Sequence, residues 1–510
     1  MRQLIELIKL INIERLQANG LWNIVFERDS KMEQLCEAIA AGQIITDEEA
    51  ALLLYGSKTA GTKYLNLKER LKERLINSVF LLEFKSTGFS TRHKAYFECN
   101  RKWAAIMVLL TRNAKLIGID MLESLLKHAQ HFEFTEITMN ILSILRLHYG
   151  TIQGDQNKYN QYRDAYRHHQ QVWMMENEAE EMYTHLVSHF VNSKSTKIEI
   201  ADKAQVYYDQ IAPTMASNDS FRLHLCGRLI QTTIHSSRND YLTTASVCED
   251  AIAFFQKKDF DSNLPLQAFY YQLVVCYIQL REFERGQAII QDYQSLFEEG
   301  SFNWLKLQES YFLLSTHTRH YETAYEVCER VAPFLRNTAH PAQIQEMWKI
   351  YEAYVRYLAR IGKIESKSAA HGAIKFKPGK FMNEIPTFSK DKRGMNIPIL
   401  VIQTLFSLSD KNYHQAIDRI EAIEKYCSRY LTQGDTFRSS CFIKMLLQIP
   451  AASFHREAVL RKSEALHKQL HSVPLEVAYQ THEIEIIPYE DLWEMAMEDL
   501  QNQIYKSGKR

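Results

Sequence analysis

Four stretches of this 510-residue chain share one pattern, and that repetition constrains the fold more than any other feature. Each stretch opens with two polar residues and an aromatic residue, and a small residue follows three or four positions later. A medium-sized apolar residue comes next, and another core-sized residue lies three positions beyond it. The stretches are "NDYLTTASVCEDAIAFF" from Asn239, "REFERGQAIIQDYQSLF" from Arg281, "RHYETAYEVCERVAPFL" from Arg319 and "KNYHQAIDRIEAIEKYC" from Lys411.

This spacing predicts the second helix of a helix–turn–helix repeat. The small residue lets the partner helix approach closely, and the later positions fill the seam between the two helices. A unit of this kind cannot bury its apolar stripe alone, so stacked neighbours must supply the core. The first three copies start about 38–42 residues apart, and the fourth follows after a longer interval. The small residues are Thr244 or Ala245, Gly286, Ala324 and Ala416.

Composition extends this prediction to the whole chain. The 17 Gly and 10 Pro are scarce for a protein of this length, and sheets joined by many tight turns need both residue types. Nearly every segment shows the i, i+3, i+4, i+7 apolar spacing of amphipathic helices. Helices are predicted at 2–18, 30–41, 47–55, 62–83, 89–110, 114–129, 133–149, 157–191, 196–212, 219–237, 241–257, 264–280, 283–298, 302–317, 321–336, 341–361, 397–409, 413–431, 436–447, 453–470 and 489–506.

One repeat resembles the tetratricopeptide repeat family. In "QAFYYQLVVCYIQLREFERGQAIIQDYQSLF" the residues that match the family pattern are Tyr270, Leu273, Val274, Tyr277, Gly286, Ile290 and Tyr293. The stretch departs from the family where Tyr293 replaces the expected Ala and where the usual Pro is missing. The chain as a whole also resembles a class of large bacterial helical-repeat proteins that carries no assigned activity. The resemblance implies an all-α fold, an elongated right-handed superhelix (solenoid) of antiparallel helix pairs.

The positions at which the repeat pattern begins, stops and resumes predict four regions. Residues 1–215 form an N-terminal helical region with degenerate helix pairs, and 216–362 hold the tetratricopeptide-like repeats. Residues 363–396 form a basic irregular insertion, and 397–510 hold C-terminal helical repeats and a cap. The apolar run from Ile397 to Leu408 covers every face of its helix, so neighbours should wrap it fully.

Charge and cysteine content exclude several classes of protein. The 61 Lys and Arg balance the 61 Asp and Glu, so the chain has no overall basic field for nucleic acid or anionic membrane. No apolar run is long enough to span a bilayer. The eight Cys form no CxxC pair and are expected as buried free thiols. We therefore expect a cytoplasmic protein.

Basic residues do gather in the insertion. Residues 363–393 contain eight Lys or Arg against three acidic residues. The alternatives for this segment are a solvated loop, which is the simpler interpretation, and a contact with an acidic partner, RNA or phosphate. A nucleotide-binding loop is not expected, because "SKDKRG" lacks a second Gly and a Gly-Lys-Ser/Thr motif. The candidate contact residues are Lys375, Lys377, Lys380, Lys390, Lys392 and Arg393.

A tetratricopeptide register would place a second candidate surface on the first helices of two repeats. Grooves of this kind bind extended peptides or helices through aromatic anchors and polar clamps. The alternative is that the same side chains only pack between repeats. The candidate groove residues are Tyr271, Val275, Ile278, Gln279, Lys306, Glu309 and His317.

Overt catalytic chemistry is sparse. Two HxxxH pairs, His185/His189 and His467/His471, put both imidazoles on one helix face, but neither has the Glu that a zincin motif requires. No catalytic residue, cofactor site or metal site is predicted. The lead hypothesis is a non-enzymatic scaffold that binds a protein or peptide through a helical-repeat groove. The alternatives are a regulatory protein that contacts nucleic acid or another polyanion through 363–393, and a metal-dependent hydrolase using a HxxxH pair.

Overall fold

The chain folds as a series of packed α-helices. The computed structural model describes residues 1–11, 22, 30–57, 59–81, 91–192, 197–335, 341–365, 396–430, 437–475 and 485–500. Within these ranges every regular element is a helix, and the all-α prediction is confirmed. The chain divides into two compact units, residues 1–159 and 160–510. The predicted region boundaries at 215, 362 and 396 all fall inside the second unit, and they stay predictions.

The first unit holds a small helical cluster and a set of helical hairpins. Its N-terminal helices enclose a core that includes Leu35, Cys36, Leu71 and Leu75. Thr46 and Glu49 form a capping box at the start of the helix from Asp47, because each side chain accepts a hydrogen bond from the other's backbone N–H. The helices are α1 (Arg2–Ile11), α4 (Lys31–Ala40), α5 (Asp47–Tyr55), α6 (Thr62–Ser78), α7 (Thr91–Thr111), α8 (Lys115–His131) and α9 (Thr135–His148).

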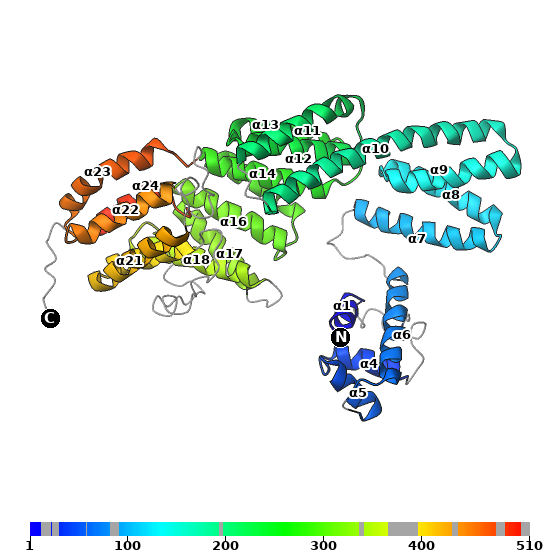
Figure 1. The fold of residues 1–510 in the computed structure, drawn as a ribbon, viewed down its shortest axis with the longest axis horizontal. Helices are drawn as coiled ribbons and strands as arrows, with labels where there is room; N and C mark the ends of the chain where they lie inside the picture. Colours follow the sequence, from blue (N-terminus) through cyan, green and yellow to red (C-terminus); the bar gives the residue numbers. More distant parts are fainter. Residues whose placement is uncertain are drawn as a thin grey trace. The chain divides into compact units, whose positions relative to one another are not determined.

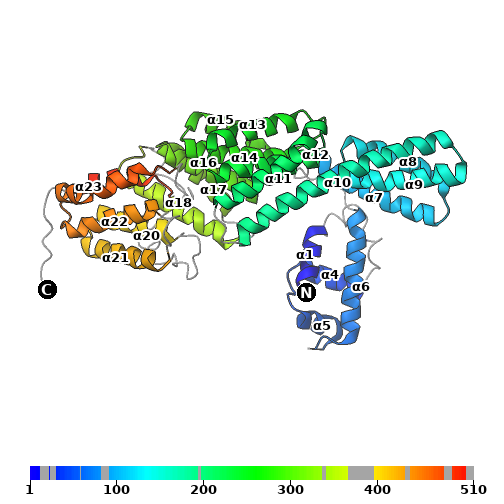
Figure 2. The ribbon, with the colours of Figure 1, turned by 45° about the horizontal axis from the view of Figure 1, so that its top comes forward.

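The second unit is built from antiparallel helix pairs (Figure 1). Helix α10 begins shortly before the boundary between the units and continues through the start of the second one. The helices are α10 (Gln156–Asn192), α11 (Lys197–Ser217), α12 (Phe221–Ser237), α13 (Tyr241–Gln256), α14 (Asn263–Leu280), α15 (Phe283–Tyr293), α16 (Phe302–His317), α17 (Tyr321–Leu335), α18 (Ala342–Arg360), α20 (Asn396–Ser409), α21 (Tyr413–Tyr430), α22 (Phe437–Ala451), α23 (Arg456–Ser472) and α24 (Tyr489–Asp499). Both views show α21, α22 and α23 side by side (Figures 1 and 2).

The repeated polar pair is the turn between the two helices of a pair. Its first residue, Asn239, Arg281, Arg319 or Lys411, has φ between 56° and 62°. The N–H of its second residue donates to a carbonyl five residues earlier, at 2.8–3.0 Å in all four copies. This is a Schellman-type helix end, in which a left-handed residue closes one helix and the next residue starts the second. The four copies therefore share the same local structure. The chain is a helical-repeat-like protein in which consecutive helices pack in pairs.

The small residues of the pattern sit where two helices meet. Ala324 and Ala416 are fully buried, as are Ile423 and Val331 further along the same helices. A Cβ added at Gly286 would lie 2.5 Å from Cδ2 of Leu314 on α16 and 3.3 Å from Cβ of Tyr277 on α14, so a larger residue there would require these neighbours to shift. At Gly286 the small residue thus permits a close approach of α14 and α16 to α15.

Helix α20 is wrapped by its neighbours, as its sequence predicts. Thirteen of its fourteen residues are buried. Pro398 lies in the first turn, where a backbone N–H has no hydrogen-bond partner within the helix, so its missing N–H costs no helical hydrogen bond. The backbone oxygen of Pro398 accepts a hydrogen bond from the Tyr354 hydroxyl of α18 at 3.0 Å. The seven cysteines whose side chains are described are all buried and free, which confirms the prediction for those residues.

Candidate functional site

The structure divides the seven predicted groove residues into two groups. Tyr271, Val275 and Lys306 are half-buried. Ile278, Gln279, Glu309 and His317 are buried within the chain. The Glu309 carboxylate accepts hydrogen bonds from the Tyr351 hydroxyl and the Lys306 ammonium, both at 2.7 Å. That these seven residues bind a partner stays a prediction.

A C-terminal segment, residues 485–499, covers the end of α16. The Thr316 hydroxyl donates to the backbone oxygen of Ile486 at 2.6 Å, and His317 Nε2 lies 2.7 Å from the backbone oxygen of Glu485. Two positions after His317, the Arg319 guanidinium pairs with the buried Asp491. These contacts join residues about 170 positions apart in sequence and cover the C-terminal end of α16, a helix in which thirteen of sixteen residues are buried.

Arg438 of α22 holds the same segment through a buried ion-pair network. Its guanidinium makes two hydrogen bonds to the Glu485 carboxylate, at 2.6 and 3.0 Å, and one to Glu490 at 2.6 Å. It also donates to the backbone oxygens of Leu470 and Val473. Burial raises the pKa of Glu485 despite the guanidinium. At the less buried Glu490 burial also acts to raise the pKa, but the hydrogen bond and the positive charge of Arg438 together outweigh it and lower the pKa.

A pocket of about 520 Å³ lies between α23 and α24. Its apolar lining comes from the buried Trp493 and Met497 of α24 and from the half-buried Leu460 of α23. Pockets that hold organic ligands fall in this size range and combine an apolar lining with a few polar groups. The polar lining residues are Arg456, Arg461, Ser463, Glu464, His467, Glu494 and Glu498.

The charges around this α23–α24 pocket are not balanced locally. Each of its three carboxylates pairs with a cation outside the pocket: Glu464 with Lys468 at 2.7 Å, Glu494 with Arg319 at 3.2 Å, and Glu498 with Lys363 at 2.8 Å. Within the described part of the chain, the pocket's two arginines form no ion pair, and Arg456 Nε is buried without a hydrogen-bond partner. A carboxylate on a ligand would satisfy these guanidinium groups.

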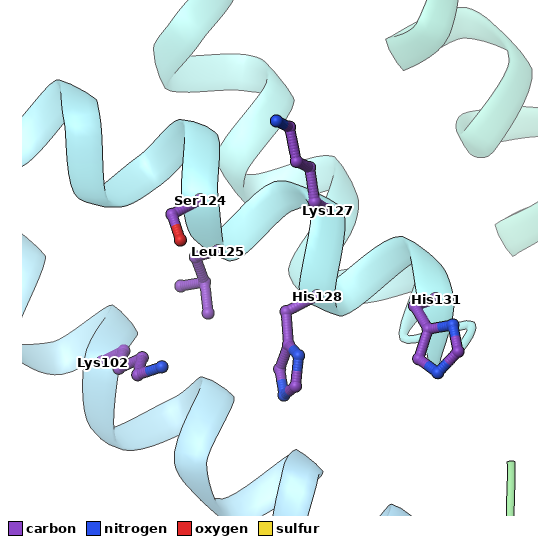
Figure 3. Close-up of a pocket in the computed structure, with 6 residues that line it drawn as sticks. All are labelled: Lys102, Ser124, Leu125, Lys127, His128 and His131. Carbon is purple, nitrogen blue, oxygen red and sulfur yellow. The ribbon is translucent and has the colours of Figure 1, made fainter.

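A second pocket, of about 340 Å³, lies between α7 and α8 in the first unit. It is lined by Lys102, Ser124, Leu125, Lys127, His128 and His131. Figure 3 shows Lys102 reaching from α7 toward the ring of His128, with Ser124 one turn earlier on α8. Lys127 and His131 point to other sides of α8 (Figure 3). Within the part of the chain that the structure describes, no carboxylate lines this α7–α8 cleft.

The two HxxxH pairs have different surroundings. His185 Nδ1 lies 2.8 Å from the Tyr207 hydroxyl, and its Nε2 lies 3.5 Å from the Lys203 ammonium. His467 and His471 share a face, as predicted, with ring centroids 4.3 Å apart. Among the described residues, no three His, Cys, Asp or Glu side chains come together in a way that could hold a metal ion.

The basic loop residues Lys375, Lys377, Lys380, Lys390, Lys392 and Arg393 lie outside the described residues. Of the predicted insertion, residues 363–365 and Asn396 are described. Lys363 uses its ammonium group to pair with Glu498 of α24. None of the described helices is both long enough and apolar enough to cross a membrane.

Comparison with protein-family models, curated proteins and solved structures finds no match to this chain. The candidate sites therefore depend on geometry. Sequence reasoning missed both pockets, because each is formed by residues that two helices bring together. One signal was present: His467 lies in the HxxxH motif singled out from the sequence, and it lines the α23–α24 pocket.

Proposed function

We propose that this chain is a non-enzymatic scaffold that binds a protein or peptide at the surface of its helical repeats. We further propose that its helix pairs stack as a right-handed, tetratricopeptide-like superhelix. The four matching turns support the stacking, since a repeat array is built by stacking copies of one helix–turn–helix unit. The buried free cysteines suit a reducing compartment, and we propose a cytoplasmic location.

The observation that carries the binding proposal is the α23–α24 pocket. A buried tryptophan and methionine offer an apolar surface of the kind that takes up an anchor side chain from a partner. The arginines beside it have no carboxylate partner in the described chain, whereas the glutamates already have cations. The pocket therefore suits a peptide in which an apolar side chain adjoins a carboxylate, such as Asp, Glu or a free C-terminus.

Selection of peptides from a random library on the full-length protein tests this proposal. Enriched peptides should pair an apolar residue with an acidic group. Arg461→Glu, an exposed change at the pocket, should weaken them by roughly tenfold or more, because it replaces attraction by repulsion. Arg330→Glu on α17 makes the same charge change at an exposed site outside the pocket and should have no effect. Failure to enrich any peptide, or equal binding by Arg461→Glu, would refute the proposal.

A further inference from the structure

The α7–α8 cleft concentrates hydrogen-bond donors and positive charge. Lys102 contributes an ammonium group from α7, and Ser124 and His128 contribute a hydroxyl and an imidazole from successive turns of α8. Spacing of i, i+4 puts the two α8 side chains on one face of that helix. Leu125 supplies the apolar part of the lining. The three polar groups therefore line one cleft from two antiparallel helices.

The described chain gives these donors no ion-pair partner, although the charge of Glu98 on α7 acts on His128. Lys102 and Lys127 form no ion pair there, and His128 Nε2 is shielded from solvent without a hydrogen-bond partner. A shielded ring nitrogen with no partner costs free energy, so a ligand that pairs with it would bind favourably. Since Lys102 reaches toward the same ring (Figure 3), the ligand that suits both groups is an anion.

We propose that the α7–α8 cleft binds the phosphate group of a small phosphorylated compound, held by Lys102, Ser124 and His128. The phosphate oxygens accept from all three groups, which match its capacity for several strong hydrogen bonds. The donors line one cleft, whereas a polymer would need a basic track along the surface. The cleft volume of about 340 Å³ leaves room for the rest of a small molecule beside the phosphate.

Protonation of His128 is coupled to this binding. Burial lowers the pKa of His128, and the positive charges of Lys102 and His131 lower it further, while Glu98 acts in the opposite direction. A bound phosphate adds negative charge beside the ring and raises that pKa. Because binding then takes up a proton, phosphate should bind more tightly as the pH falls from about 8 to about 6.

Calorimetric titration of the full-length protein with inorganic pyrophosphate tests the proposal. We expect saturable binding that weakens roughly tenfold or more in Lys102→Gln. His128→Gln keeps an N–H donor at this position but cannot take up a proton there. The pyrophosphate affinity that this variant retains should therefore lack the pH dependence that His128 contributes. Lys115→Gln is the matched control, because it removes one exposed charge from the same hairpin outside the cleft. Its affinity should stay within about twofold of the parent protein.

Three results would overturn the proposal. The first is that the parent protein, shown by circular dichroism to be helical, binds no pyrophosphate saturably near pH 6. The second is an equal loss in Lys102→Gln and Lys115→Gln, which would indicate attraction to net charge alone. The third is binding of a single-stranded oligonucleotide without binding of pyrophosphate, which would indicate a polymer site.

Discussion

Replacing Arg438 by methionine should release the C-terminal segment 485–499 from the rest of the second unit. Methionine fills similar space but leaves the fully buried Glu485 without its cation, and it leaves the carbonyls of Leu470 and Val473 without a donor. Removing one partner of a buried ion pair costs about 3–5 kcal/mol, mostly because the remaining charge stays in a poorly solvating environment. We therefore expect Arg438→Met to lower local stability by about 4 kcal/mol.

Hydrogen exchange is the suitable assay, because a chain of two compact units need not unfold in one step. In the regime where exchange reports the opening equilibrium, a loss of about 4 kcal/mol speeds exchange of the 485–499 amides roughly a thousandfold. Arg330→Met, an exposed change on α17, should leave these rates nearly unchanged. Arg438→Met/Glu485→Met should exchange more slowly than Arg438→Met alone, because it also removes the orphaned carboxylate.

The pH dependence gives an independent check with a definite sign. Burial already raises the pKa of Glu485 above its unfolded value, and loss of Arg438 must raise it further. The native state then binds more protons than the unfolded state, so stability falls as the pH rises through the folded pKa. The deficit of Arg438→Met should therefore shrink as the pH is lowered from about 7 toward about 5. A deficit below about 1 kcal/mol, or one independent of pH, would refute this reasoning.

Three other predictions follow from the packing. Gly286→Ala should destabilise the second unit by about 1–3 kcal/mol in urea denaturation, since its methyl group meets Leu314, and a neutral result would mean that the helices separate easily. Tyr351→Phe should cost about 1.5–3 kcal/mol because the buried Glu309 loses a charged hydrogen bond, and an unchanged urea midpoint would contradict that. Burial raises the pKa of Cys36 to about 12, so its thiol should resist a thiolate-specific reagent near pH 8 until urea is added, and rapid labelling of the native protein would disprove its burial.

Local features of the fold could be predicted from the sequence. The apolar period located the helices, with α5 and α16 matching their predicted bounds residue for residue. The polar pair before each aromatic was visible as a repeat, although its cause, a left-handed residue followed by a helix start, needed the backbone geometry. The burial of α20 followed from a run in which every face is apolar.

The covering of α16 could not be predicted, because it depends on residues far away in the chain. A tetratricopeptide register assigns His317 to an open groove, and nothing near His317 in sequence indicates that Glu485 lies against it. The pattern of residues 485–499 predicts only an amphipathic helix, which does not specify the surface it packs on. Both pockets were missed for the same reason, since helix periodicity gives each helix a face but does not pair the faces.

The short turn inside each of the four repeated helix pairs, two or three residues long, limits how this protein can tolerate a change in length. One residue added between Arg319 and Tyr321 would rotate α17 by about 100° and lift its apolar stripe away from α16. Residues inserted between two helix pairs leave the two helices of each pair in the same orientation. The free-energy cost of such an insertion is therefore mainly the entropy of closing a longer loop. Natural or engineered length variants should therefore differ between pairs, while the length within each pair stays constant.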